Sequence, residues 1–217
     1  MLCLAPCHAR LVCDRCARDL DGDAQSCVAC AARIDPAIGS CTQCRRARFA
    51  FDRALARFDY RFPLDRLVQR FKYGGDLAIG GWLARALAER VEREPRVDLL
   101  VVPPLSAERL RERGFNQALE IAKVVGDRIG VPVARELILR TRDVQAQAAL
   151  GREARRENVR GAFACTAALA RSRVAIVDDV LTTGATADAI ARALRSAGAA
   201  SIAVWAVARA PDPERAP

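Results

Sequence analysis

The segment VAIVDDVLTTGAT, residues 174–186, joins two adjacent acids to a loop of threonines around one glycine. Asp178 and Asp179 end an apolar run that is typical of a strand covered on both faces, and their carboxylates can accept hydrogen bonds from sugar hydroxyls. The loop that follows contains Thr182, Thr183, Gly184, Ala185 and Thr186. Threonine hydroxyls, free backbone N–H groups and the positive end of a helix favour a phosphate monoester. The pattern predicts a ribose 5-phosphate site, whereas an aspartate that only caps the helix would explain just one of the acids.

Eight of the nine cysteines lie between Cys3 and Cys44, mostly as C-x2-C pairs. That spacing lets two thiolates reach one tetrahedral ion. The more regular set consists of Cys27, Cys30, Cys41 and Cys44. A second set, with irregular spacing in its first pair and His8 as a substitute ligand, consists of Cys3, Cys7, Cys13 and Cys16. A redox role is the alternative, but a succession of pairs in a reducing compartment favours one or two structural zinc ions.

Composition limits the class of protein. The chain has 217 residues, 52% of them hydrophobic, which suits a main domain plus a small module. It contains no apolar run of transmembrane length and no pattern of a signal peptide, so we expect a cytoplasmic protein without membrane insertion. The formal net charge of +9 favours polyanionic partners, although a solvated basic surface would give the same value.

Alternating strands and helices position these residues. From about Phe49 the order predicts an open parallel α/β sheet with right-handed crossovers. We expect strands at 54–62, 97–104, 133–139, 173–179 and 201–208. We expect helices at 64–73, 77–94, 116–130 and 185–198. The predicted division is a Cys-rich zinc ribbon at 1–48, an α/β domain at 49–210 and a disordered tail at 211–217.

The acidic segment resembles the diphosphoribose-binding motif of type I phosphoribosyltransferases across its full length. The resemblance implies that 5-phosphoribosyl-1-diphosphate binds with magnesium, that an acceptor attacks C1 of the ribose, and that pyrophosphate leaves. It implies that Asp178 and Asp179 bind the ribose hydroxyls and that residues 182–186 bind the 5-phosphate. Purine-salvage members with a carboxylate base in this loop carry an aspartate where this chain has Thr182. The acceptor therefore needs no base, or the base comes from elsewhere.

A second resemblance covers almost the whole chain. RERGFNQALEIA at 111–122 is similar to the hallmark of the ComF family, and the cysteine pairs, FKYGGD at 71–76 and VVPPLS at 101–106 also fit. The stretch at 140–163 matches the family's long loop, although Val144 replaces a common threonine. The family implies a phosphoribosyltransferase-like domain behind a zinc ribbon, and an association with DNA uptake and natural competence.

Further cations and a proline pair complete the expected site. Pro103 and Pro104 end a strand and can shape a pyrophosphate loop, and Arg111 and Arg113 follow closely with guanidinium groups that match phosphate. Lys72 is either a phosphate ligand or a surface lysine.

The polar segment at 140–160 is rich in arginine. We interpret it as a lid that excludes water from a ribosyl cation, with Arg155 in a catalytic role beside Arg152 and Arg156; a solvated basic helix is the alternative.

Two functions follow from these patterns. The first is phosphoribosyl transfer to an acceptor that the sequence does not name. The second is a phosphoribosyltransferase-like protein that binds single-stranded DNA, together with the competence machinery. Single-strand binders usually pair basic grooves with aromatic side chains, and the aromatic content of 5% favours the first function.

Overall fold

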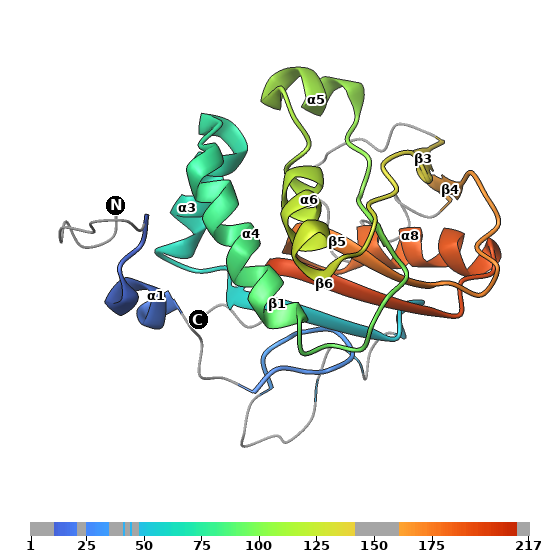
Figure 1. Cartoon of the computed structure of the whole chain (residues 1–217), viewed down its shortest axis with the longest axis horizontal. Coiled ribbons are helices and arrows are strands. Elements are labelled where there is room, and N and C mark those ends of the chain that lie inside the picture. Colours follow the sequence, from blue (N-terminus) through green and yellow to red (C-terminus); the bar gives the residue numbers. More distant parts are fainter. Residues whose placement is uncertain are drawn as a thin grey trace.

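Four parallel strands form the centre of the computed structural model, which describes residues 11–20, 25–34, 41, 44, 48–141 and 161–211. Their spatial order is β1-β6-β5-β2. The strands are β1 (Arg53–Asp59), β2 (Leu99–Val101), β5 (Arg173–Leu181) and β6 (Ser201–Arg209). Figure 1 shows this sheet below helices α3, α4 and α6. The predicted open parallel sheet is confirmed.

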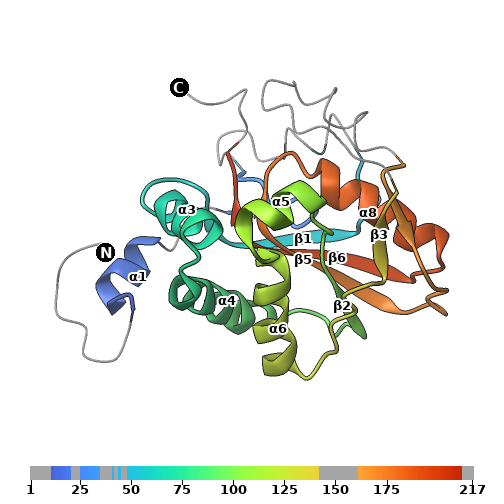
Figure 2. The same ribbon diagram turned by 90° about the horizontal axis from the view of Figure 1, so that it is seen from above.

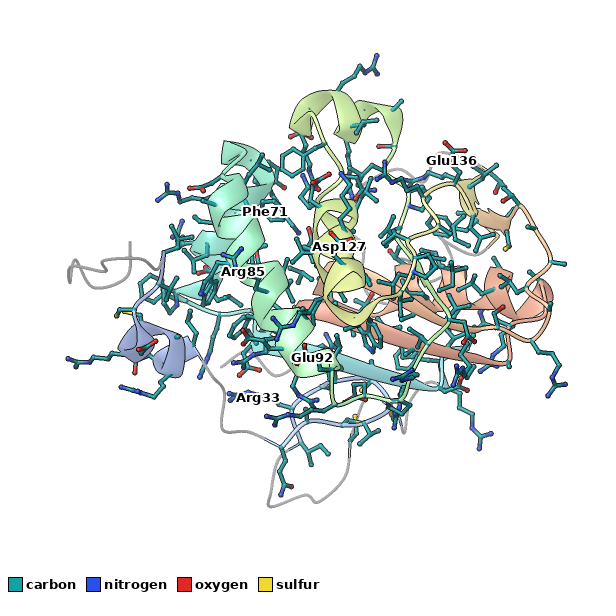
Figure 3. The ribbon with its side chains drawn as sticks, viewed as in Figure 1. Arg33, Phe71, Arg85, Glu92, Asp127 and Glu136 are labelled. Carbon is teal, nitrogen blue, oxygen red and sulfur yellow. The ribbon has the colours of Figure 1, made fainter. Side chains whose placement is uncertain are left out.

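Helices cover both faces of the sheet. One face carries α3 (Leu64–Gly74), α4 (Leu77–Val91) and α6 (Gln117–Ile129), and Figure 2 shows α8 (Ala185–Ser196) on the other face. Phe71 of α3, labelled in Figure 3, is buried among the side chains of this first layer and packs against Phe115 at 5.4 Å between ring centroids. Because both faces are covered, β6 is apolar between its two end residues and β5 is apolar from Val174 to Val177, as is typical of buried parallel strands.

A short helix, α5 (Ala107–Arg113), was not predicted from the sequence. It begins where the Ser106 side chain accepts a hydrogen bond from the N–H of Arg109, and it ends at Gly114, which has a left-handed φ of 75°. None of its residues is buried, so it has no apolar periodicity for the sequence to reveal.

The prediction of a strand at 133–139 is mostly wrong. Only Val133 makes an isolated parallel bridge, to Leu100. The regular strand is β3 (Ile138–Arg140), which pairs antiparallel with β4 (Phe163–Cys165) in a separate two-stranded sheet. The reason is local. The charged residues Arg135 and Glu136 interrupt the apolar run, so this segment cannot form a strand of the main sheet, whose two faces are both covered by helices.

The first described residues pack against the α/β core. Helix α1 (Asp14–Leu20) buries Cys16 and Leu20, and together with Val12 they belong to the same apolar cluster as Leu64 of α3. The predicted boundary at residue 48 stays a prediction. Within the described part of the chain, no helix combines the length and the apolar character needed to cross a bilayer.

Candidate functional site

The carboxyl end of β2 lies beside the middle of β5, and the residues that follow on both strands form the candidate site. Val101, the last residue of β2, is in register with Ile176, so the Pro103–Pro104 segment leaves the sheet beside the acidic pair of β5. Strand β5 continues to Leu181, two residues beyond the end predicted from the sequence. The predicted acids and proline pair therefore meet at one edge of the sheet, where open α/β sheets bind ligands.

Lys72 lies directly on the acidic pair. Its Nζ atom is 3.0 Å from Oδ1 of Asp179, and the two side chains are 17% and 12% exposed. The carboxylate of Asp178 accepts a hydrogen bond of 2.8 Å from the backbone N–H of Asp179. Lys72 is therefore not a free surface lysine: its positive charge lies beside the acidic pair. The predicted contact of Lys72 with phosphate stays a prediction.

The electrostatics of Asp178 are unusual. Burial raises the pKa of its carboxyl to about 7, the adjacent charge of Asp179 adds to the rise, and Lys72 opposes it. The folded chain therefore holds a proton on Asp178 more tightly than the unfolded chain does. Its contribution to the free energy of unfolding accordingly becomes less favourable as the pH rises from about 4 to 7.

We expect Asp178→Asn to stabilise the ligand-free protein more at pH 8 than at pH 5, by roughly 2–3 kcal/mol, because asparagine carries no charge to bury. Urea unfolding at the two pH values measures this difference. The control is Asp98→Asn: Arg173 holds the pKa of that exposed carboxyl at about 2, so its effect should not change between pH 5 and 8. Equal effects of Asp178→Asn at both values would contradict the raised pKa.

The loop after β5 turns sharply into α8. Gly184 adopts a left-handed φ of 79° at the start of the helix, a conformation that favours glycine. The Thr183 hydroxyl is buried and accepts a hydrogen bond from the N–H of Ala185, whereas Thr182 is exposed. These residues set backbone N–H groups at a helix amino end, which is an arrangement suited to an anion.

The segment between β2 and α6 is held by polar side chains. Asn116 donates to the carbonyl of Pro103 at 3.0 Å and also caps α6. Arg113 donates to Gln117 at 3.0 Å and to the hydroxyl of Tyr73 at 3.4 Å, with its guanidinium 5.1 Å from that ring's centroid. The predicted phosphate contact of Arg113 competes with these bonds. Arg111 is exposed on α5.

Gln117 is a residue that the sequence reasoning missed. It is 1% exposed and donates to the backbone carbonyl of Lys72 at 3.4 Å, so it connects α6 to the lysine at the acidic pair. A polar residue at a buried position of an otherwise amphipathic helix is the signal that could have found it.

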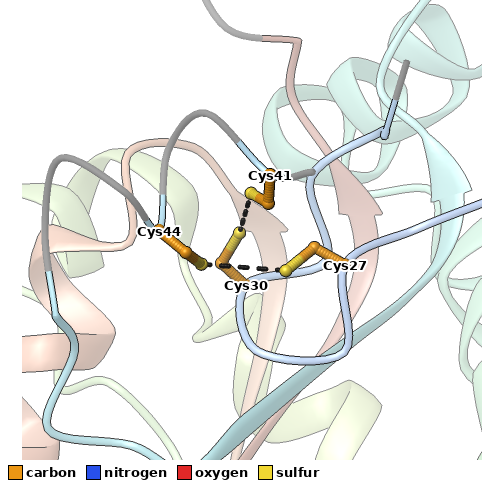
Figure 4. A group of neighbouring side chains, drawn as sticks. All are labelled: Cys27, Cys30, Cys41 and Cys44. Atoms are coloured by element: carbon orange, nitrogen blue, oxygen red, sulfur yellow. Dashed lines mark hydrogen bonds between the residues drawn. The ribbon is translucent and has the colours of Figure 1, made fainter. Parts of the chain in front are cut away.

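The four cysteines of the regular set converge, as Figure 4 shows. Their sulfur atoms all lie within 4.8 Å of one another. The sulfurs of Cys27 and Cys44 are 3.7 Å apart and those of Cys30 and Cys41 are 3.4 Å apart. Thiolates on tetrahedral zinc, at ~2.3 Å from the ion, stand about 3.8 Å from one another. The cluster is compatible with zinc.

Burial and hydrogen bonds between the thiols shift their pKa values. Burial raises the pKa of Cys30 well above its usual range and that of Cys44 to about 12. For Cys41, burial is outweighed by hydrogen bonds from the Cys44 backbone and the neighbouring thiols, and its pKa is lowered. A cation among the four sulfurs would favour their thiolate forms.

The second predicted cysteine set is described only in part. Cys13 and Cys16 lie at the start of α1, where the Cys13 sulfur accepts a hydrogen bond of 3.4 Å from the Cys16 N–H. Cys3, Cys7 and His8 lie outside the described residues, as do Arg152, Arg155 and Arg156 of the predicted lid. Cys165 is half-buried.

Known proteins share these features. The family model described as "Phosphoribosyl transferase domain" matches residues 110–217. "Competence protein F" of Haemophilus influenzae is 31% identical over 193 residues, which cover 85% of this chain and 84% of that protein. "DNA utilization protein YhgH" of Salmonella typhi is 30% identical over 204 residues, 91% of this chain and 90% of that protein. "Competence protein ComFC" of Streptococcus pneumoniae is 25% identical over 154 residues, 71% and 67% of the two chains.

The similarity to "DNA utilization protein YhgH" of Salmonella typhi covers 91% of this chain and leaves only 9% unmatched, so it spans the four-cysteine cluster as well as most of the α/β domain. The chain therefore belongs to the ComF family and combines an N-terminal four-cysteine cluster with a phosphoribosyltransferase domain of the type I fold.

Proposed function

We propose that this protein binds 5-phosphoribosyl-1-diphosphate with magnesium and transfers its phosphoribosyl group to an acceptor. The observation that carries the proposal is the continuous edge formed by Lys72, the Asp178–Asp179 pair and the turn at Gly184. Hydrogen-bond acceptors for a diol stand directly before N–H donors for a phosphate. The spacing suits one sugar phosphate that spans both groups.

In this proposal the ribose hydroxyls donate to Asp178 and Asp179, while the 5-phosphate accepts from the backbone N–H groups and threonine hydroxyls of residues 182–186. The acceptor atom forms a bond to C1 as the bond from C1 to the diphosphate oxygen breaks, and pyrophosphate leaves with the electron pair. Holding the ribose at both ends fixes C1 for attack and lowers the entropic part of the barrier.

The metals have separate roles. Magnesium prefers oxygen ligands and is usually held by one or two carboxylates plus substrate phosphates, so Asp178 or Asp179 together with donor oxygens fit it. When bound, it would supply positive charge to the leaving diphosphate. Zinc, which we place on the four-cysteine cluster, would be structural because four protein ligands close its shell.

The nature of the acceptor follows in part from Thr182. This side chain has no titratable group and is exposed, so it cannot remove a proton at neutral pH. We therefore expect an acceptor that is nucleophilic without a carboxylate base in this loop.

The proposed location is a reducing compartment, because such a compartment keeps the cysteines as thiols. The cytoplasm is such a compartment.

Calorimetry with the donor and magnesium, without an acceptor, tests the first step. Ribose 5-phosphate should compete, because it carries both groups that the site recognises. A panel of nucleobases and amines, screened for pyrophosphate release, then identifies the acceptor. Absence of donor binding would overturn the proposed function; donor binding without release by any acceptor would leave a binding protein.

Single-stranded DNA binding is the second candidate. The names of the relatives, which refer to competence and DNA utilization, and the net charge of +9 favour it. Replacement of Arg152, Arg155 and Arg156 by alanine separates the two functions. Loss of donor affinity alone would support the predicted lid. A weaker DNA affinity, with the salt slope reduced by about 0.7 per lost phosphate contact, would support DNA binding.

A further inference from the structure

Arg209 connects the cysteine cluster to the loop that follows β5. It is the last residue of β6 and is 4% exposed. Its Nε atom donates to the carbonyl of Cys30 at 3.1 Å. Its Nη1 atom donates to the carbonyl of Leu181 at 2.8 Å and also to that of Thr182. One buried guanidinium therefore holds a zinc-ligand residue and the first residues of the phosphate loop together.

Each end of this bridge belongs to a different proposed ligand site. The carbonyl of Cys30 belongs to the turn that carries two of the four thiols, so its position depends on the geometry of the cluster. Leu181 and Thr182 begin the loop that turns at Gly184 toward the backbone N–H groups of α8. Nη1 also donates to the carbonyl of Ala210 at 2.9 Å, so displacement of the Cys30 carbonyl would cost this buried guanidinium its bond from Nε to Cys30 while its bonds to the loop remain.

A second contact connects the same two places. Phe49 packs against the cluster of Cys27, Cys30 and Ala32, and its ring also touches the turn: a Cβ atom at Gly184 would lie 3.0 Å from Phe49 Cε1. In the next residue, the N–H of Ala50 donates to the Asp188 carboxylate in the first turn of α8 at 2.6 Å. The segment after the cysteines therefore contacts the helix side of the phosphate loop, at Gly184 and in the first turn of α8.

Other contacts hold the cysteine turn on the sheet. Arg33 forms an ion pair with Asp59 at the end of β1, and Ala31 is buried in the same apolar cluster as Ala54. The carbonyl of Val28 accepts a hydrogen bond of 2.9 Å from the N–H of Ala54, at the exposed edge of β1. Beside it lies a cavity of about 290 Å³ lined by Val28, Arg33 and Arg57, and Arg209 borders it. These contacts hold the turn on β1, whereas those of Arg209 and Phe49 reach the loop that follows β5.

We propose that Arg209 is a positioning residue that couples zinc binding at the cysteine cluster to donor binding at the loop of residues 181–186. The inference rests on the proposed function. In the zinc-bound protein the cluster fixes the Cys30 carbonyl, Arg209 transmits that position to Leu181 and Thr182, and the loop N–H groups are ready for the 5-phosphate. Coupling of this kind is reciprocal, so the bound donor also raises the affinity of the cluster for zinc.

The test compares the zinc-loaded and zinc-depleted wild-type protein with Arg209→Met, which keeps an unbranched side chain out to the position of Nε and removes all the hydrogen-bond donors. Amide hydrogen exchange at residues 181–186, without any donor, reports on the loop. We expect zinc removal or Arg209→Met to speed this exchange and to weaken donor binding about tenfold, within the usual ~5–150-fold range of coupling. Zinc removal from Arg209→Met should add little, and that variant should still bind zinc.

The matched control is Arg173→Met, the same change at the amino end of β5, where the guanidinium pairs with exposed Asp98. It should alter neither loop exchange nor donor affinity. Equal exchange and affinity in the zinc-loaded and zinc-depleted wild-type protein would overturn the coupling. If Arg209→Met does not fold, Arg209→Lys replaces it, because lysine keeps the charge but not the planar fork. The comparison of zinc-loaded with zinc-depleted wild-type protein also tests the coupling without any substitution.

The outcomes also distinguish the two proposals. If the zinc-loaded wild-type protein does not bind the donor, the proposed function fails, while the exchange rates still show whether zinc orders the loop. If the donor binds equally with and without zinc, the function stands and the coupling is wrong.

Discussion

Replacement of both Asp178 and Asp179 by asparagine is expected to weaken binding of the phosphoribosyl donor by about 100-fold to 10,000-fold. Each ionised carboxylate that accepts from a ribose hydroxyl contributes ~1.5–3 kcal/mol, and every 1.4 kcal/mol corresponds to about tenfold in affinity. The asparagine side chains keep the size of the acids but lose their charge. Calorimetry at pH 8, where Asp178 is mainly ionised, measures the loss.

The pH dependence provides an internal check. In the wild-type protein donor affinity should fall as the pH drops below about 7, because Asp178 then becomes protonated. The double variant should lose that component, whereas Asp98→Asn, at the opposite edge of the sheet, should retain it. Substitution also frees Lys72 from Asp179 and exposes its charge to a bound anion. An unchanged or higher donor affinity in the double variant would therefore show that Lys72, and not the acids, governs the site.

The second large effect concerns the cysteine cluster. We expect Cys30→Ser to remove zinc from the set of four and to lower the melting temperature strongly. In zinc-finger peptides structural zinc binds with an apparent free energy of ~10–16 kcal/mol, and where the unfolded chain has no formed site this is free energy of folding. Cys30 is 1% exposed and its sulfur is 3.4 Å from that of Cys41, so a substitute at this position cannot avoid the cluster.

Native mass spectrometry of the reduced protein counts the zinc, and thermal unfolding measures the stability. The control is Cys165→Ser, since this half-buried cysteine lies in β4, away from the four sulfurs. It should keep the zinc content of the wild-type protein. A second ion, lost on replacement of Cys13 but not of Cys30, would confirm the second predicted set. Reduced wild-type protein that is purified folded without zinc and takes up none when zinc is added would contradict both sites.

Local patterns in the sequence were sufficient to predict the parallel sheet and most helix limits, and to select the candidate acids. Helix α3 was predicted at 64–73 and extends over Leu64–Gly74, because Leu64, Leu67 and Phe71 repeat at the helical period. Such patterns fail where burial does not follow a period. Helix α5 buries nothing, and the apolar residues near Ile138 pair in a small antiparallel sheet outside the main one.

The sequence by itself determined the residue types at the site: adjacent carboxylates after a buried strand, a glycine where the turn needs a left-handed φ, and thiols at metal-binding intervals. Only the tertiary structure decided which distant residues join them. Lys72 reaches Asp179, and Arg209 reaches Cys30 and Thr182 from the end of β6. The physical reason is that hydrogen bonds and ion pairs between distant segments depend on strand order and register, which neither periodicity nor motif spacing encodes.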